Sequence, residues 1–335
     1  GMTLWAKSKP KPDPHMHAFI APLALLLERW LGYPPRLTDA IGHPVIWMGR
    51  FIAFMEKGVD KRERAPRQRR DAGIFTLAVL LLVTLAITLV VQQLLRSIPF
   101  GWVLEIVVAT PFLAQKELGR AVEAVATALR TSLESGREAV SHVVGRDSAA
   151  LDEAGVARAA IETLAESTSD GVVAPWFWLV IFGLPGIALY KAVNTADSMI
   201  GHLNERYRDY GWAAAKLDDL VNWLPARLTA ILVTAACFVT PHASPGAAWA
   251  AARRDASKHA SPNAGWPESA FAGALGFKLG GPRSYEGELV DLPSFGTGKA
   301  DLVASDILRA LVLYRGTLNV LLGLSVVVAL LVWAA

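Results

Sequence analysis

The stretch GIFTLAVLLLVTLAITLVVQQLL, from Gly73 to Leu95, contains no charged residue. A helix rises about 1.5 Å per residue, so about 20 consecutive apolar residues cover the hydrocarbon core of a bilayer. Helices of soluble domains seldom need such a run, because they usually keep one polar face toward water. The stretch therefore predicts a membrane-spanning helix.

Further long apolar runs follow along the chain. The segment Ser97–Gln115 has Glu105 as its single charged residue, and the segments Gly171–Tyr190 and Gly316–Ala335 have none. Each is long enough to predict a span, and 97–115 would pair with 73–95 as a hairpin.

Two shorter apolar runs allow more than one interpretation. Residues 18–27 could form a short span, a re-entrant segment or an interfacial helix. Residues 228–240 could span only if part of 222–227 also enters the membrane. With 53% hydrophobic residues and a mean hydropathy of +0.35, the chain is predicted to be an all-α, polytopic integral membrane protein with about four to six membrane segments.

The whole chain, 1–335, is predicted to form a single membrane-embedded domain. Residues 241–315 are rich in Gly and Pro with little periodicity, which predicts a long loop region. Residues 116–170 are predicted to be a polar helical insert, because apolar residues recur there at helical spacing. These apolar residues are Val122, Val125, Ala126 and Leu129.

Charge and cysteine content argue against several classes of protein. The net charge of +3 gives no indication of nucleic-acid binding. The basic segment Arg50–Asp71 precedes the strongest span, as expected for a cytoplasmic loop, and a nucleic-acid-binding patch is the competing interpretation. The single cysteine, Cys237, cannot form an internal disulfide or a cysteine-rich metal site. Gly296–Lys299 is followed by Ala300 in place of Ser or Thr, which argues against a phosphate-binding loop.

A dense polar stretch, residues 194–228, lies between two apolar runs. Charged groups inside a membrane are costly unless they are paired or hydrated, so they are candidates for function. The alternatives are a solvated loop or ion pairs that join helices. The candidates in this first cluster are Asn194, Asp197, Asn204, Glu205, Arg206 and Asp218.

Two further clusters carry polar side chains suited to chemistry. The segment 253–269, RRDASKHASPNAGWPES, is either a ligand-binding loop or an exposed connector. Its candidates are Lys258, His259, Asn263 and Glu268. The segment 162–175, ETLAESTSDGVVAP, contains Asp170, which could hold Mg²⁺ or be an ordinary polar residue at a helix end.

Taken together, these clusters resemble one known family. The motifs AESTSDGVVAP, NTADSMIGHLNERYRDYGWAAAKLDDLVNWLPARL and SKHASPNAGWPESAFAGALGFKLGGPRSYEGE occur in this order. They are similar to motifs of the CobD/CbiB family, the adenosylcobinamide-phosphate synthases of cobalamin biosynthesis. The resemblance is close over 143–288 and looser in the N-terminal third. The chain departs from the family at Ser167, where Asn is usual, and at Tyr33-Pro34, where Asp-Pro is usual.

The resemblance implies a multi-pass enzyme of the cell inner membrane. Such an enzyme would join the carboxylate of the corrinoid adenosylcobyric acid to the amine of (R)-1-aminopropan-2-ol phosphate, using ATP and Mg²⁺. The product would be adenosylcobinamide phosphate, and a threonine-phosphate-type amine is an alternative substrate. The implied partners are these substrates, the lipid bilayer and other cobalamin-pathway enzymes, but not nucleic acid.

This chemistry suggests roles for the candidate residues. A carboxylate must be activated, plausibly as an acyl phosphate, which calls for Mg²⁺ and cations around the phosphate, and the amine then needs a base. Asp170 and Asp218 are predicted metal ligands. The predicted catalytic residues are Asp197, Glu205, Lys258 and His259. The predicted substrate-binding residues are Asn194, Asn204, Arg206, Asn263 and Glu268.

Two other functions fit parts of the sequence. A transporter or channel would also have broken helices and charges within the membrane, although no internal repeat is visible. A non-catalytic, AmpE-like signalling protein would lack the Asn, Asp and Lys clusters. If the segment 223–240 spans the membrane, the first and second clusters lie on opposite sides of the bilayer. A single active site that uses both clusters therefore requires one segment to be re-entrant or to lie at the membrane surface.

Overall fold

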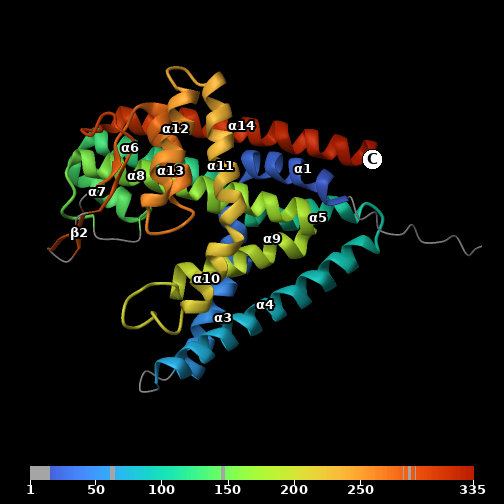
Figure 1. Cartoon of the computed structure of the whole chain (residues 1–335). Coiled ribbons are helices and arrows are strands. Elements are labelled where there is room, and N and C mark those ends of the chain that lie inside the picture. The colour runs from blue at the N-terminus through green and yellow to red at the C-terminus, as the bar shows by residue number, and fades with distance from the viewer. Residues whose placement is uncertain (1–15, 61–64, 145–147, 282, 286–287, 291) are drawn as a thin grey trace, which may run out of the picture.

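The computed structural model describes residues 16–60, 65–144, 148–281, 283–285, 288–290 and 292–335, without the side chains of 35, 37, 41, 283–285 and 288–290. Most of this chain is helical, as predicted (Figure 1). The helices are α1 (Met16–Leu31), α2 (Pro35–Ile41), α3 (Pro44–Val59), α4 (Pro66–Arg96), α5 (Gly101–Ala109), α6 (Gln115–Thr131), α7 (Leu133–Ser141), α8 (Glu153–Thr168), α9 (Ala174–Ile200), α10 (Trp212–Val221), α11 (Trp223–Ala236), α12 (Pro245–Asp255), α13 (Gly265–Leu275) and α14 (Ala304–Ala334). Short helical turns are η1 (Thr110–Phe112), η2 (Ser169–Val173), η3 (Cys237–Val239) and η4 (Ala256–Lys258).

Four short strands form two antiparallel pairs. Strand β1 (Leu279–Gly280) pairs with β4 (Ser294–Phe295), so that Leu279 lies opposite Phe295. Strand β2 (Arg283–Tyr285) pairs with β3 (Glu288–Val290) as a separate hairpin. These strands are an addition to an otherwise helical fold.

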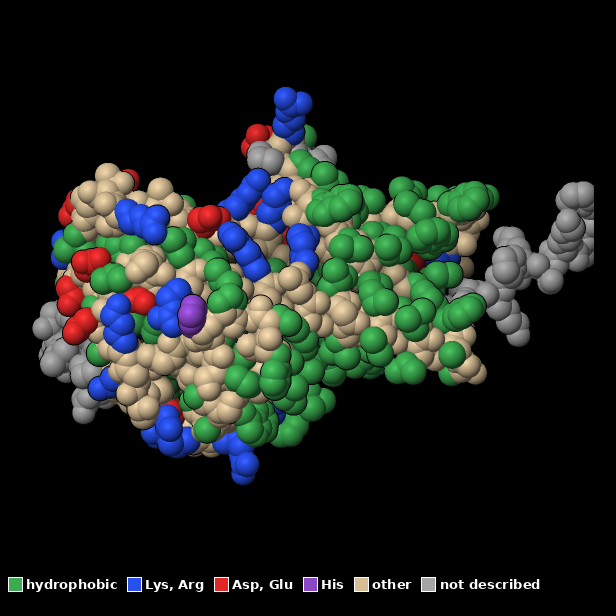
Figure 2. Space-filling model, turned by 90° about the horizontal axis from the view of Figure 1, so that it is seen from above, with side chains coloured by type: hydrophobic (Ala, Val, Ile, Leu, Met, Phe, Trp, Pro, Cys, Tyr) green, Lys and Arg blue, Asp and Glu red, His purple; other side chains and the backbone are tan. Residues whose placement is uncertain are grey.

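Helices α4 and α14 expose apolar side chains, and they contain the predicted spans 73–95 and 316–335. Figure 2 shows apolar side chains gathered over one half of the visible face and charged side chains over the other. The exposed residues include Leu82, Ile87, Val90 and Leu94 of α4, and Leu330, Leu331 and Trp333 of α14. So large an apolar surface is suited to lipid rather than water.

Three helical stretches in the described chain are long and apolar enough to cross a membrane. They are α4, α14 and the continuous run Glu153–Ile200, which includes α8, η2 and α9. The bent pair of α10 and α11 would be a fourth. The number of candidate spans thus reaches the lower end of the predicted range.

The apolar segment 171–190 does not form one straight helix. At Gly183 the backbone has φ 65° and ψ −150°, and Pro185 follows two residues later. The hydroxyl oxygen of Tyr190 lies 3.1 Å from the carbonyl oxygen of Asp170, 20 residues earlier. A straight α-helix would place residues so far apart in sequence about 30 Å from each other. The chain therefore reverses at Gly183 and forms a helical hairpin, hereafter the α9 hairpin.

The segment 97–115 is a correction to the predicted pattern, because it does not form a spanning helix. Helix α5 has only nine residues, and it begins after Phe100, which has a positive φ of 58°. The one charged residue, Glu105, is fully buried and accepts hydrogen bonds from Gln92 and Arg96 of α4. These hydrogen bonds hold one face of α5 against α4. The apolar composition of 97–115 therefore reflects packing against protein as well as contact with lipid.

The region 241–315 also differs from the predicted long loop. It contains α12 and α13 and the start of α14. Helix α12 begins with Ser244, whose hydroxyl accepts a hydrogen bond from the backbone N–H of Ala247, and Pro245 occupies the first turn. Both helices are rich in Ala and Gly, whose weak hydropathy conceals the helical periodicity in the sequence.

Helix α11 runs across α14 rather than alongside it (Figure 1). Helix α12 then returns beside α11, so the chain comes back toward the end where α11 began. Accordingly, the side-chain nitrogen of Asn263 donates a 2.8 Å hydrogen bond to the carbonyl oxygen of Asp219. The first and second polar clusters therefore meet at the same end of α11, which removes the conflict expected if 223–240 separated them.

The hydrophobic core lies where the α9 hairpin meets α1, α8, α11 and α14. Leu164, Leu179 and Leu313 are fully buried there. The apolar run 18–27 lies within α1, which has 16 residues and packs against α9 and α14. This packing holds both arms of the hairpin in place.

Candidate active site

The reversal at Gly183 assembles a polar cluster from both arms of the α9 hairpin and from α10. We call this cluster the hairpin site. It consists of Asp170, Tyr190, Lys191, Asn194, Asp218 and Asn222. Three of these, Asp170, Asn194 and Asp218, are residues that the sequence predicted as metal or substrate ligands. The structure brings them together from segments that lie up to 48 positions apart in the sequence, at Asp170 and Asp218.

A hydrogen-bond chain connects four members of the hairpin site, which are Asp170, Tyr190, Asn222 and Asp218. The hydroxyl oxygen of Tyr190 lies 2.9 Å from Oδ1 of Asn222 and 3.1 Å from the carbonyl oxygen of Asp170, so either can accept its proton. The amide of Asn222 donates to Oδ2 of Asp218 at 2.9 Å. Because Asn222 follows Asp218 by one helical turn, this pair fixes the orientation of the carboxylate.

Three charged groups face one another in this site. The carboxylates of Asp170 and Asp218 lie close enough to repel each other, and Lys191 lies close enough to attract both. Glu166 adds further negative charge beside Asp170. The ammonium group of Lys191 donates to Oδ1 of Asn194 at 3.3 Å. The site thus holds opposed charges in a largely buried setting, where their interactions are strong.

The carboxylates of Asp170 and Asp218 fit a Mg²⁺ ion. Mg²⁺ prefers oxygen ligands and is often held by one or two carboxylates together with substrate phosphates. Oδ1 of Asp218 is buried without a hydrogen bond of normal geometry, and the Asn194 side chain lies beside the carboxylate. No group of three or more potential metal-ligating side chains occurs within the described residues.

Asp197, a predicted catalytic residue, lies at the edge of the hairpin site. Its carboxylate interacts electrostatically with Asp218, Asp219 and His202. It is mostly buried at the end of α9, where its carbonyl oxygen accepts a hydrogen bond from the amide of Gly201. Its position next to the site is compatible with the role of a base.

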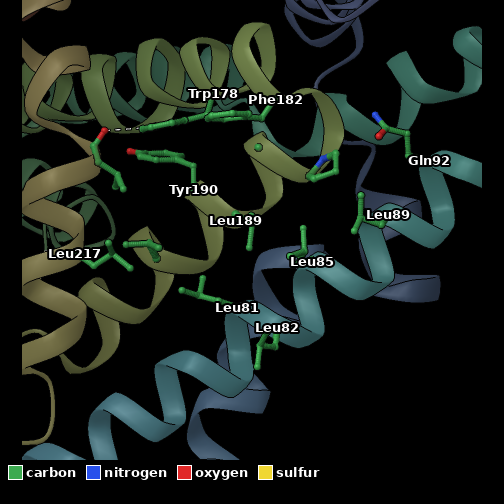
Figure 3. A pocket seen from close by; sticks show the side chains of 14 residues that line it. Leu81, Leu82, Leu85, Leu89, Gln92, Trp178, Phe182, Leu189, Tyr190 and Leu217 are labelled. Atoms are coloured by element: carbon green, nitrogen blue, oxygen red, sulfur yellow. Dashed lines mark hydrogen bonds between the residues drawn. The ribbon is translucent and has the colours of Figure 1, made fainter. Parts of the chain in front are cut away.

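An apolar cavity of about 530 Å³ adjoins the hairpin site between α4 and the α9 hairpin. Figure 3 shows Trp178, Phe182 and Tyr190 along one side and leucines of α4 along the other. The rings of Trp178 and Phe182 stack with centroids 5.7 Å apart. Tyr190 therefore has its ring in apolar surroundings and its hydroxyl among polar groups, which suits a boundary position.

The loop 201–211 lies outside the hairpin site and is attached to α3 and α4. Arg206 forms an ion pair with Glu56 of α3 at 2.6 Å. Arg69 of α4 donates hydrogen bonds to the carbonyl oxygens of Glu205 and Arg206. These contacts hold the loop against the two helices.

The loop also contains Asn204, whose side-chain oxygen accepts a 3.0 Å hydrogen bond from the amide of Tyr207. Asn204 therefore stabilises the turn itself. The three predicted loop residues, Asn204, Glu205 and Arg206, thus lie on a loop outside the hairpin site, and the side chains of Asn204 and Arg206 make contacts that maintain this loop.

The second cluster meets α10 and α11 through Asn263. Its Oδ1 accepts a hydrogen bond from Arg227 at 3.3 Å, while its amide is bound to the carbonyl of Asp219. The guanidinium of Arg227 also lies over the rings of Trp223 and Trp266, 4.3 and 5.0 Å from their centroids. Asn263 thus ties the second loop to the helix that carries Asp218.

Lys258 belongs to a separate ion-pair network centred on Asp255. Oδ1 of Asp255 lies 2.7 Å from Nζ of Lys258, and Oδ2 lies 2.6 Å from Arg254. The amide of Gly296 also donates to Oδ2. Although burial by itself would raise the pKa of the Asp255 carboxyl, the hydrogen bonds from Arg254, Lys258 and Gly296 lower that pKa to about 2.

The last two predicted residues, His259 and Glu268, lie close together. Nε2 of His259 lies 3.6 Å from Oε1 of Glu268, and its Nδ1 accepts a hydrogen bond from the amide of Ser261 at 2.9 Å. Glu268 is almost completely buried, whereas His259 is partly exposed. The pair shapes the loop that leads to Asn263, and it lies in a different network from Asp170 and Asp218.

The fold and site together define a helical membrane-embedded protein that carries a polar, carboxylate-lined site on a helical hairpin. A family model described as CobD/Cbib protein matches residues 21–314. The chain therefore belongs to the CobD/CbiB family.

Curated relatives support this membership over nearly the whole chain. The cobalamin biosynthesis protein CobD of Brucella anthropi is 48% identical over 319 residues, covering 93% of this chain and 97% of the relative. The protein of the same name from Rhodobacter capsulatus is 44% identical over 312 residues, covering 92% of this chain and 95% of the relative. The one from Rhizobium meliloti is 43% identical, covering 89% and 93%. No solved structure gave a significant match.

Sequence analysis did not predict four polar residues at or beside the site. These residues are Tyr190, Lys191, Asn222 and Arg227. Lys191 precedes Asn194 by one helical turn, and Asn222 follows Asp218 by one turn, so helical spacing carried a usable signal. Tyr190 could be identified only from the reversal at Gly183.

Proposed function

We propose that this protein catalyses ATP-dependent amide-bond formation between adenosylcobyric acid and (R)-1-aminopropan-2-ol phosphate, giving adenosylcobinamide phosphate in cobalamin biosynthesis. The main observation in favour is the hairpin site, where Asp218 has a buried oxygen without a hydrogen bond next to Asp170 and Lys191. The family membership and the names of the relatives support a role in cobalamin biosynthesis, and the substrates are those that the motif resemblance implies.

The proposed reaction has two balanced steps. A carboxylate oxygen of the corrinoid attacks the terminal phosphorus of ATP, which forms an acyl phosphate and releases ADP. The amine, after losing a proton to a base, attacks the acyl carbon, and inorganic phosphate leaves as the amide forms. Both steps develop charge on phosphate oxygens, so they call for nearby cations.

The hairpin site provides groups suited to these steps. Asp170 and Asp218 would hold Mg²⁺, which would neutralise charge on the phosphate during transfer. Lys191 would place a second positive charge beside it. Asp197 suits the role of the base better than Glu205, because Glu205 is exposed on the loop that is attached to α3 and α4. Asn194 would hydrogen-bond substrate or position Lys191.

The second loop would close the site from the other side of α10. Asn263 is bound to the residue next to Asp218, so a corrinoid held by Asn263, Lys258 and His259 would lie close to the proposed metal ligands. Because α11 and α12 return this loop to the same end, one substrate could contact both clusters. We place the protein in the cell inner membrane as a multi-pass enzyme, with other cobalamin-pathway enzymes as candidate partners.

The test is a reconstituted reaction. The protein, purified in detergent, is supplied with adenosylcobyric acid, aminopropanol phosphate, ATP and Mg²⁺, and the corrinoid product is measured by mass spectrometry. We expect adenosylcobinamide phosphate in amounts that match ADP release, and none when ATP is omitted. Threonine phosphate is supplied in a parallel reaction to identify the amine. Absence of an amide with either amine, although the corrinoid binds, would contradict the proposed ligase activity.

A further inference from the structure

A second cavity, of about 510 Å³, lies between α3 and the second arm of the α9 hairpin. Its lining residues are Val45, Ile46, Gly49, Arg50, Ala53, Lys191, Asn194, Thr195, Ser198 and Met199. Lys191 and Asn194 are also members of the hairpin site. The cavity therefore adjoins the proposed metal ligands, on the side that α3 covers.

The charged residues in the lining of this cavity are both cations. Arg50 comes from α3 and Lys191 from α9, while no Asp or Glu lines the cavity. Arg50 is exposed, and no carboxylate pairs with it in the described part of the chain. Lys191 has its positive charge partly balanced by Asp170 and Asp218. A cavity lined by an ammonium and by a guanidinium that has no carboxylate partner among the described residues is suited to an anion.

The close packing of α3 and α9 fixes the separation of the two helices that carry these cations. A Cβ atom added to Gly49 would lie 3.1 Å from Sδ of Met199, so the two helices approach closely at this point. His43, before the first turn of α3, lies within electrostatic range of Lys191. Burial and then Lys191 lower the pKa of His43, which favours its neutral form.

We propose that this cavity binds a phosphate group, with Arg50 and Lys191 as its cationic ligands and the Asn194 amide as a hydrogen-bond donor. The inference rests on the proposed function, which requires two phosphate-bearing substrates beside Asp170 and Asp218. Arg50 can make two parallel hydrogen bonds to phosphate oxygens, whereas Lys191 supplies a point charge. A phosphate held here would be close to the carboxylates that we propose as metal ligands.

The phosphate could belong to the nucleotide, to the amino-alcohol phosphate or to a lipid headgroup, and binding measurements separate these sources. Detergent-purified protein is titrated in a calorimeter with ATP, with aminopropanol phosphate and with a short-chain phosphatidic acid. Each ligand is tested with and without Mg²⁺. The ligand whose affinity depends most on Arg50 identifies the source.

Three substitutions and a matched control test the ligands. Arg50→Gln removes an exposed charge that has no ion-pair partner in the described segments, so the fold should remain intact, and we expect about tenfold weaker binding of one phosphate ligand. Lys191→Gln should have the same effect or a larger one. Arg120→Gln removes an exposed cation on α6, outside the cavity, and should leave affinity unchanged. Arg50→Lys should restore part of the affinity, since the charge returns without the fork geometry.

Because binding of a phosphate ligand and formation of the amide are measured separately, the phosphate site and the proposed ligase activity can fail independently. If Arg50→Gln weakens binding of a phosphate ligand but no amide forms in the reconstituted reaction, the phosphate site holds and the ligase proposal fails. If the amide forms and Arg50→Gln binds all three ligands as tightly as the unsubstituted protein, the phosphate site is wrong. Because Lys191 also pairs with carboxylates, Ser198→Asp provides a second variant. It adds a negative charge to the cavity lining and should also weaken binding.

Discussion

The α9 hairpin and α14 have similarly apolar sequences but different structures. The apolar part of α14 is a continuous helix whose most hydrophobic window is 28% buried within the protein, whereas the corresponding window of Glu153–Ile200 is 67% buried. Helix α14 exposes a face to lipid, while the α9 hairpin reverses at Gly183 and directs polar groups to a site. Hydropathy therefore identifies segments whose side chains avoid water, but it does not distinguish a segment surrounded by lipid from one surrounded by protein.

The largest expected effect is on turnover, and it comes from a substitution in the hairpin site at Asp218. Asp218→Asn removes the charge from the carboxylate whose Oδ1 is buried without a hydrogen bond. We expect turnover to fall by about 100-fold or more, because a metal ligand and its charge are lost. The rate is measured as corrinoid product per enzyme by mass spectrometry.

Asp301→Asn is the matched control for Asp218→Asn. It replaces an exposed carboxylate shortly before α14, and it should leave the rate unchanged. Retention of full activity by Asp218→Asn, with an unaltered melting temperature, would show that the hairpin site does not hold the reacting groups.

The reversal itself is tested at Gly183. Alanine at this position must adopt a positive φ, and its Cβ would lie 2.4 Å from the ring of His17. Strain and overpacking together should lower the free energy of unfolding by about 2–4 kcal/mol. The change is measured as loss of thermal stability in detergent.

Gly323 of α14 offers the corresponding substitution in the straight helix. Its added Cβ would meet no atom within 4 Å, so Gly323→Ala should cost no stability. Equal effects at the two glycines would contradict the difference drawn between the hairpin and α14.

This comparison also explains how far the sequence could predict the molecule. The spans in α4 and α14 follow from length and hydropathy, because lipid is the only suitable solvent for such surfaces. Asp170, Asn194 and Asp218 were identified as candidates from polar residues beside apolar runs. Their convergence could not be predicted, because it depends on the backbone at Gly183. For the same reason 171–190 was predicted as a span rather than a hairpin.

The second loop shows a different limit of prediction. Lys258 and His259 are residue types common in active sites, yet in the structure each is paired within its own loop region, with Asp255 and with Glu268. Residue type alone cannot show whether a cation binds substrate or a neighbouring carboxylate. Their predicted catalytic roles therefore remain predictions, and Asp255 offers a way to measure the structural part of that network.

The smallest expected effect lies in this network, away from the α9 hairpin. Asp255 has a folded-state pKa of about 2, below the ordinary value of 3.8, so its ion pairs stabilise the protein fully at neutral pH. This contribution should decline as the pH falls from about 4 toward 2, because the carboxyl then becomes protonated. Asp255→Asn should lower the free energy of unfolding by about 1 kcal/mol at pH 7, since Arg254 and Lys258 are half exposed and their charges are screened.

Melting temperatures of the unsubstituted protein and Asp255→Asn, recorded from pH 7 to pH 2.5, measure this contribution. The difference between the two proteins should shrink at the acid end, whereas Asp301→Asn should match the unsubstituted protein throughout. A difference that stays constant with pH would mean that Asp255 acts through its shape and hydrogen bonds rather than its charge. The Asp255 network would then stabilise the protein in a way that does not depend on charge, as the packed core near α14 does.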